Sequence, residues 1–220
     1  MRKKKLITGS IYHVFNRSIA NFKIFKDELC YWRIINVIRY YQRKKPTKKF
    51  SDFIKTMNSH ENNSYINIPC FRSQNLVDIV AYCIMPTHIH LVLKQLQDKG
   101  ISIFVNNIFN SYTRYFNVRH KRRGPLWESR FKNVLVKTDE QLIHLTRYIH
   151  LNPVTAYLIH RPEEWIFSSC NEYLRRIEEE NKICNYNYIL DIEPNSYEKF
   201  MKDRISYQRE LAKIKNLFLE

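Results

Sequence analysis

Residues 81–93 constrain the fold of this chain most strongly. They read AYCIMPTHIHLVL, two apolar runs separated by Pro86-Thr87. This pattern predicts strands over residues 78–85 and 88–94, joined by a tight turn. Side chains alternate between the two faces of a strand, so His88 and His90 should project from one face while Ile89 enters the core. Two neutral imidazoles on one face can bind a metal ion, although histidines at this spacing often form only hydrogen bonds.

The remaining periodicity predicts an alternation of strands and helices. We expect a strand over 11–17, a helix from Asp27-Glu28 to Tyr41, a helix over 101–115, a strand over 131–136 and a helix over 139–151. With the two strands above, the first six elements have the order of the α+β ferredoxin-like fold, a split βαβ with a four-stranded antiparallel sheet and two helices on one face. The strand that carries His88 and His90 should then be central in the sheet.

The last of these helices has a start and a stop signal. Thr138-Asp139-Glu140-Gln141 matches a capping box in which Thr138 is the N-cap and the Gln141 side chain reaches back. Pro153 is expected to end the helix, because a proline disfavours helical geometry at the residue before it. Within the helix His144, Tyr148 and Asn152 recur every four residues and therefore share one face. Tyr148 offers a phenolic nucleophile, and Asn152 offers a carbonyl oxygen that suits a metal ion.

Charge is concentrated in two parts of the chain. The formal net charge is +16; residues 1–50 hold 14 basic and 2 acidic side chains, and residues 101–137 hold 8 basic and 1 acidic. From 161 to the end there are 10 basic and 12 acidic side chains. A concentrated positive field indicates a polyanionic ligand, and the aromatic residues among these basic ones favour nucleic acid over a membrane surface.

The cysteines and the hydropathy indicate which cellular compartment to expect. The five cysteines (Cys30, Cys70, Cys83, Cys170 and Cys184) are odd in number, scattered, and form no Cys-x-x-Cys pair. Reduced thiols in the cytoplasm are therefore expected, without a disulfide framework or a zinc ribbon. No apolar run approaches the ~18 residues of a membrane span.

Four motifs follow one another along the chain: Tyr12-His13-Val14, Met85-Pro86-Thr87-His88-Ile89-His90, Leu126-Trp127-Glu128-Ser129-Arg130-Phe131-Lys132 and Arg147-Tyr148-Ile149-His150-Leu151-Asn152-Pro153. In this order they resemble the single-tyrosine HUH transposases, and most closely their REP-associated tyrosine transposase branch. Trp165-Ile166-Phe167-Ser168-Ser169 also resembles a segment that follows the catalytic helix in that branch. The resemblance covers residues 8–174; the aperiodic stretch 44–74 and the acidic tail after about 175 depart from it.

The resemblance implies a role for four residues. His88 and His90 match the paired metal ligands, Tyr148 the nucleophile, and Asn152 the polar residue that completes coordination of Mg²⁺ or Mn²⁺. The implied reaction is nicking and strand transfer on single-stranded or hairpin DNA through a 5′-phosphotyrosine. The catalytic domain would occupy residues 1–160, with an insertion at about 44–74, and a helical C-terminal extension would follow over 161–220. Neither His144 nor His150 matches a catalytic role.

The basic residues that flank the strand before the Tyr148 helix are the candidates for DNA phosphate contacts. They are Arg114, Arg119, Lys121, Arg122, Arg123, Arg130 and Lys132. A protein that acts on DNA in this way is expected in the cytoplasm, associated with the nucleoid, and both a monomer and a homodimer fit the pattern. Two other functions stay open at this point: a nucleic-acid-binding module without catalysis, and a metal-dependent nuclease that uses water instead of Tyr148.

Overall fold

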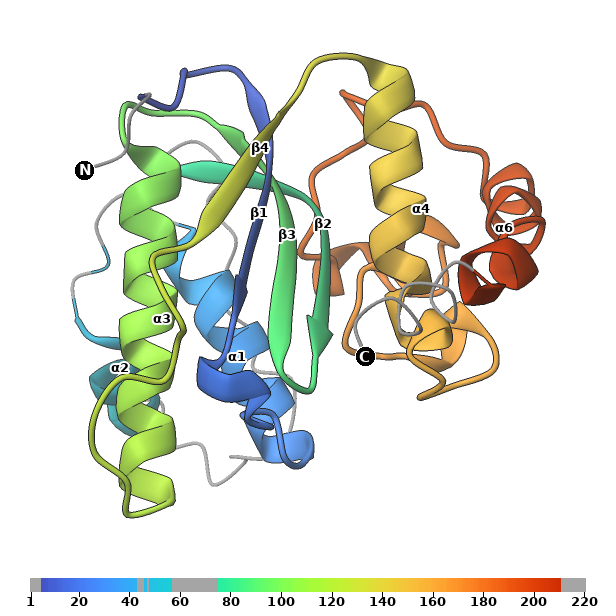
Figure 1. Cartoon of the computed structure of the whole chain (residues 1–220). Helices are drawn as coiled ribbons and strands as arrows, with labels where there is room; N and C mark the ends of the chain where they lie inside the picture. Colours follow the sequence, from blue (N-terminus) through green and yellow to red (C-terminus); the bar gives the residue numbers. More distant parts are fainter. Residues whose placement is uncertain (1–4, 43–45, 47, 57–74, 211–220) are drawn as a thin grey trace.

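A four-stranded antiparallel sheet forms the centre of the computed structural model, which describes residues 5–42, 46, 48–56 and 75–210 (Figure 1). Its strands are β1 (Ile11–Arg17), β2 (Val77–Met85), β3 (His88–Gln95) and β4 (Lys132–Val136). The spatial order is β2-β3-β1-β4, and every neighbouring pair is antiparallel. β1 and β3 are therefore central, as the ferredoxin-like prediction requires. The predicted fold is confirmed, and strand ends differ by one residue, since β4 begins after the buried Phe131.

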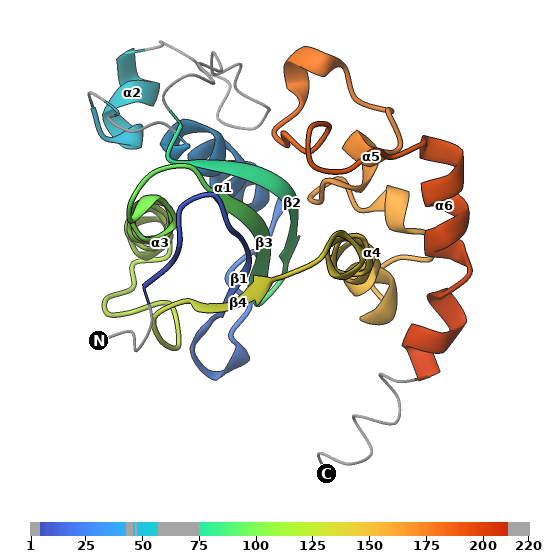
Figure 2. The same ribbon diagram turned by 90° about the horizontal axis from the view of Figure 1, so that it is seen from above.

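Helices cover both faces of the sheet, as Figure 2 shows. On one side lie α1 (Glu28–Tyr41) and α3 (Gly100–Arg119), which pack on each other. On the other side lies α4 (Asp139–Thr155). Buried apolar residues of the central strands, such as Val14 and Ile89, form the core under α1 and α3. Because the alternation of side chains is strict, the histidines next to Ile89 face α4.

The start of α4 follows the prediction, and its end does not. The Thr138 hydroxyl accepts a hydrogen bond from the N–H of Gln141 at 3.1 Å. The Gln141 side chain also reaches back, but its oxygen accepts from the N–H of Lys137, one residue before the cap. The sequence predicts an end at 151, yet the helix continues through Pro153 to Thr155. Pro153 is buried, and the hydrogen bond from Ala156 N–H to Asn152 O closes another turn. The packing of Pro153 therefore outweighs the unfavourable helix propensity of a proline at this position.

The chain after α4 borders the outer edge of β2. Its helices are short, and irregular chain separates them: η3 (Pro162–Glu164), α5 (Cys170–Tyr173), η4 (Glu179–Asn181) and α6 (Pro194–Lys202). Ile84 N–H donates to Phe167 O, and Ser169 N–H donates to Tyr82 O, both at 3.0 Å. The segment thus satisfies backbone groups that an edge strand would otherwise leave open.

Two further short helices complete the described fold, η1 (Ile19–Asn21) after β1 and α2 (Phe50–Thr56). Helix α2 belongs to the predicted insertion at 44–74; most of the rest of that insertion lies outside the described residues. Cys30, Cys83, Cys170 and Cys184 are free and buried, as expected, whereas Cys70 lies outside the described ranges. In the described part of the chain, no helix combines the length and apolarity needed to cross a bilayer.

Candidate functional site

His88 and His90 open into a cavity of about 340 Å³ beside α4. Strand alternation produces this arrangement, because Ile89 between them is fully buried on the opposite face. The register of β1 and β3 places Arg17 opposite His88 and Phe15 opposite His90. The cavity is lined by Phe15, Asn16, Arg17, His88, His90, Glu128, Lys132 and Tyr148.

The Tyr148 ring lines the same cavity as the two histidines. Its centroid is 6.0 Å from that of His90, and the two rings are nearly perpendicular at 85°. The His88 and His90 rings are themselves 5.1 Å apart. Tyr148 is 45% exposed, so its phenol is accessible to a ligand that enters the cavity. Residues 60 positions apart in sequence are thus brought together by the packing of α4 on the sheet.

One nitrogen of each cavity histidine is already engaged. His88 Nδ1 lies 2.9 Å from the hydroxyl of Thr87, and His90 Nδ1 lies 2.9 Å from Nε2 of His13. Within the described residues, Nε2 of His88 and Nε2 of His90 have no hydrogen-bond partner. A ring nitrogen bound to a neighbour fixes the orientation of the imidazole and leaves the other nitrogen for a ligand.

Burial keeps these imidazoles neutral near pH 7. It lowers the pKa of His88 to about 4, with a further contribution from the charge of Arg17. The pKa of His90 is held well below its ordinary value by burial first, then by His88, His13 and Arg17. Burial also lowers the pKa of His13 to about 4. A neutral imidazole has a free lone pair, which is the form that binds a metal ion.

Asn152 lies one turn beyond Tyr148 on α4 and does not line the cavity. Its side-chain nitrogen is buried and has no hydrogen-bond partner among the described residues. Neither do those residues contain a group of three or more His, Cys, Asp or Glu placed to hold a metal. Two neutral imidazoles with free Nε2 atoms fit a divalent ion that keeps open positions for other ligands. The third ligand remains a prediction.

Sequence reasoning assigned no role to His13, Arg17 or Glu128, which the structure places at or beside the cavity. Alternation along β1 puts His13, Phe15 and Arg17 on one face, and that signal is present in the sequence. The register against β3 decides which imidazole each one meets, and the sequence alone does not fix it.

Two of the seven predicted DNA contacts are held by the protein itself. The guanidinium of Arg119 donates to both carboxylate oxygens of Asp27 at 2.9 Å, and this pair fixes the cap of α1. Arg122 donates to the side chain of Asn117 and to the carbonyls of Gly124 and Pro125, and so shapes the loop after α3.

The other five lie in three places. Lys132 lines the histidine cavity. Lys121, Arg123 and Arg130 are exposed on the loop between α3 and β4. Arg114 lines a different cavity, next to α1 and α2. The structure therefore does not gather the seven into one site.

Comparisons with known proteins agree with the motifs. The family described as "Transposase IS200 like" matches residues 54–152. A Haemophilus influenzae protein provisionally named REP-associated tyrosine transposase is 28% identical over 102 residues, which is 42% of this chain and 58% of that protein. The matched segment thus spans less than two thirds of this relative.

A solved structure of a REP-associated tyrosine transposase bound to a REP hairpin has the same fold. Its TM-score is 0.56, and the alignment covers 88% of this chain and 94% of that chain. At 15% identity this likeness supports the fold alone. The motifs and these comparisons agree: over residues 54–152 the chain is similar to the IS200-like transposases, it resembles a REP-associated tyrosine transposase in sequence, and it shares the fold of another.

Proposed function

We propose that the chain nicks and transfers DNA strands by attack of Tyr148 on a phosphodiester held at His88 and His90. The observation that carries this proposal is the accessible Tyr148 ring, 6.0 Å from a neutral imidazole in a shared cavity. A structural tyrosine would not need to face two imidazoles whose outer nitrogens are free.

His88 and His90, joined by Asn152, would hold a divalent ion such as Mg²⁺ or Mn²⁺. Such an ion, when bound, neutralises charge that develops on the scissile phosphate. Arg17 and Lys132 line the same cavity and supply positive charge that would orient the phosphate. Thr87 and His13 hold the two imidazoles in place through their Nδ1 atoms.

In the proposed reaction the Tyr148 oxygen forms a bond to phosphorus, and the bond from phosphorus to the 3′-oxygen breaks. The phenolic proton leaves, and the departing 3′-oxygen takes up a proton to become a hydroxyl. A phenol has a pKa of about 10, so a proton acceptor is required. Glu128 supplies a carboxylate in the cavity lining. Attack by another 3′-hydroxyl on the 5′-phosphotyrosine reverses the step and joins strands.

The proposed substrate is single-stranded or hairpin DNA. The relative whose structure is solved was bound to a REP hairpin, and exposed Lys121, Arg123 and Arg130 are available for phosphate contacts. This activity would place the protein on the nucleoid in the cytoplasm. It is compatible with a monomer or a homodimer.

Covalent capture tests the proposal. The protein is incubated with hairpin-bearing single-stranded oligonucleotides, with Mn²⁺ or with EDTA, and protein–DNA adducts are resolved on denaturing gels. We expect an adduct that needs Mn²⁺ and is lost in Tyr148→Phe. Tyr157→Phe is a matched control, because Tyr157 is also exposed and follows the same helix. Undiminished cleavage by Tyr148→Phe would instead identify a hydrolytic nuclease.

A further inference from the structure

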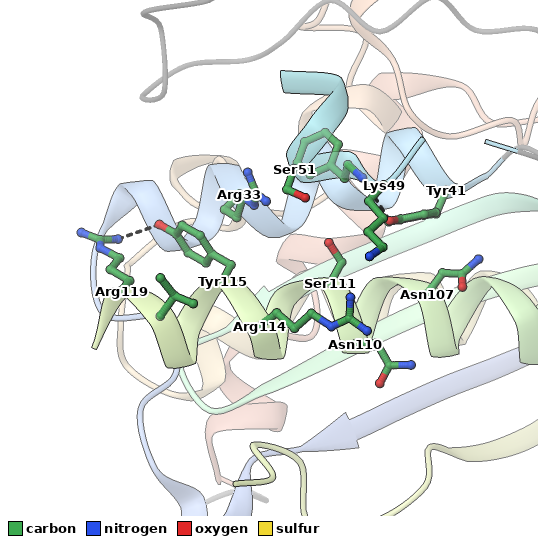
Figure 3. Close-up of a pocket in the computed structure, with 12 residues that line it drawn as sticks. Arg33, Tyr41, Lys49, Ser51, Asn107, Asn110, Ser111, Arg114, Tyr115 and Arg119 are labelled. Atoms are coloured by element: carbon green, nitrogen blue, oxygen red, sulfur yellow. Dashed lines mark hydrogen bonds between the residues drawn. The ribbon is translucent and has the colours of Figure 1, made fainter. Parts of the chain in front are cut away.

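We propose that a second cavity, on the side of the sheet covered by α1 and α3, binds a nucleotide unit through its phosphate. This cavity has a volume of about 610 Å³ and lies between α1, α3 and the start of α2 (Figure 3). The histidine cavity lies on the α4 side of the sheet, so the two are separate. The size falls in the range of ~300–1,000 Å³ that is typical of small-molecule sites.

Positive charge dominates the lining. Arg33 on α1, Lys49 before α2 and Arg114 on α3 contribute basic side chains, and the described lining contains no carboxylate. Figure 3 shows Lys49 reaching from the α2 side toward Ser111 and Arg114. Arg119 also borders the cavity, but its charge is paired with Asp27. Three cations without an acidic neighbour in the lining favour an anionic ligand.

Arg33 is the strongest indication of an anion. Its guanidinium lies 4.5 Å from the ring centre of Phe50 and 4.9 Å from that of Tyr115. Its Nε is buried without a hydrogen-bond partner in the described chain. Burial also lowers the pKa of this guanidinium. A partly buried cation with an unused donor is stabilised by an anion placed next to it.

Neutral polar groups beside the cations suit a nucleotide rather than a simple ion. Asn107, Asn110, Ser111 and Arg114 occur at steps of three and four along α3, so they share the face that borders the cavity. Amides can donate to and accept from a base edge, and a hydroxyl can donate to a phosphate oxygen. The Tyr115 ring in the lining adds an aromatic surface.

Two ligands present the same phosphate and base to this cavity: a free nucleotide and a nucleotide within a DNA strand. Two probes separate them: dAMP, followed by isothermal titration calorimetry, and a short fluorescein-labelled single-stranded oligonucleotide, followed by anisotropy. Both titrations use the full chain. If the cavity variants bind both probes more weakly, the cavity is a pocket that a free nucleotide can fill. If they bind only the oligonucleotide more weakly, the cavity contacts a nucleotide within a DNA strand.

Isosteric variants on α3 give the sharpest comparison. Asn110→Asp places a carboxylate in the cavity, while Asn106→Asp places the same charge on an exposed part of the same helix outside the lining. We expect Asn110→Asp to weaken binding about tenfold through repulsion of the phosphate, and Asn106→Asp to change it by less than about twofold.

A lysine pair checks the charge contribution in the same way. Lys49 lines the cavity, whereas Lys55 is exposed on α2 outside the lining. Lys49→Gln should reduce the slope of log affinity against log salt by about 0.7, and Lys55→Gln should leave it nearly unchanged. All four positions are exposed, and circular dichroism verifies the fold of each variant.

Equal affinities of cavity and control variants for both probes would overturn the assignment. Adduct formation at Tyr148 is a separate measurement. Its absence would refute the nicking reaction without affecting the binding comparison, so the two proposals fail independently.

Discussion

His90 and His150 are both buried histidines with depressed pKa values, yet their ring nitrogens have different surroundings. Both nitrogens of His150 are engaged: Nδ1 lies 2.8 Å from the Tyr197 hydroxyl and Nε2 lies 2.7 Å from the Ser169 hydroxyl. His90 has one nitrogen engaged by His13 and faces a cavity with the other. Burial and a low pKa therefore do not separate the proposed metal ligand from a histidine of the core; an unused nitrogen that faces a cavity does.

The His150 network fastens α4 to the C-terminal part of the fold. The Tyr197 hydroxyl donates to Thr146 on α4, and the Ser169 hydroxyl also lies 3.2 Å from the carbonyl of Tyr82 on β2. The sheet, α4 and α6 are thus joined through one ring. Tyr148, two residues before His150, is positioned by this packing.

Acidification should therefore destabilise the fold through His150, and this is the largest effect we expect. Burial lowers the His150 pKa from 6.5 to about 3. The unfolded chain then binds more protons than the folded one below pH 6.5, so the stabilising contribution is complete above pH 6.5 and is lost as pH falls toward 3. Over that whole window the loss is on the order of 5 kcal/mol. Urea unfolding at pH 7, 6 and 5 measures its onset.

His150→Gln provides the comparison for this titration. The variant should lose about 2 kcal/mol at pH 7, because Ser169 and Tyr197 lose a buried partner. Its stability should also depend less steeply on pH between 6.5 and 5. An unchanged slope would mean that His150 is not the group that titrates.

The opposite phenotype is expected at the cavity. His88→Ala should reduce formation of the Tyr148 adduct about 100-fold or more, because the proposed ion loses a ligand at the scissile phosphate. The free energy of unfolding should change by less than about 1 kcal/mol, since His88 is only partly buried and has one hydrogen bond. Adduct yield and urea unfolding are measured on the same preparations. If His88→Ala and His150→Gln showed the same pattern of losses, the distinction between the two histidines would fail.

The sequence predicts the frame of the site better than its details. Periodicity and the His88-Ile89-His90 alternation suffice for the strand order and for the face that carries the imidazoles. Pro153 misleads because helix propensity is a weak local preference, and burial of that residue overrides it. The pair of Arg119 with Asp27 could not be foreseen, because it depends on how α3 packs on α1. Long-range contacts of that kind set which charges remain available to a ligand.

The smallest effect, and the most specific, concerns His13. At 2.9 Å, either His13 Nε2 or His90 Nδ1 must carry the shared proton. For His90 Nε2 to offer its lone pair to a metal, Nδ1 must be the donor and His13 Nε2 the acceptor. His13→Phe removes the acceptor and should weaken Mn²⁺ binding about tenfold. His13→Gln returns an acceptor oxygen and should recover part of that loss.

Free Mn²⁺ measured by electron paramagnetic resonance during a titration gives the affinity without reference to activity. Val118→Phe is the control for added ring volume, because Val118 is exposed on α3 and does not line the histidine cavity. If Phe and Gln at position 13 bound Mn²⁺ equally well, the contact would only fill space. A difference between the two variants would show that the hydrogen bond to His13 on β1 sets the tautomer of His90. That tautomer leaves the lone pair of His90 Nε2 free, whereas both nitrogens of His150 are engaged.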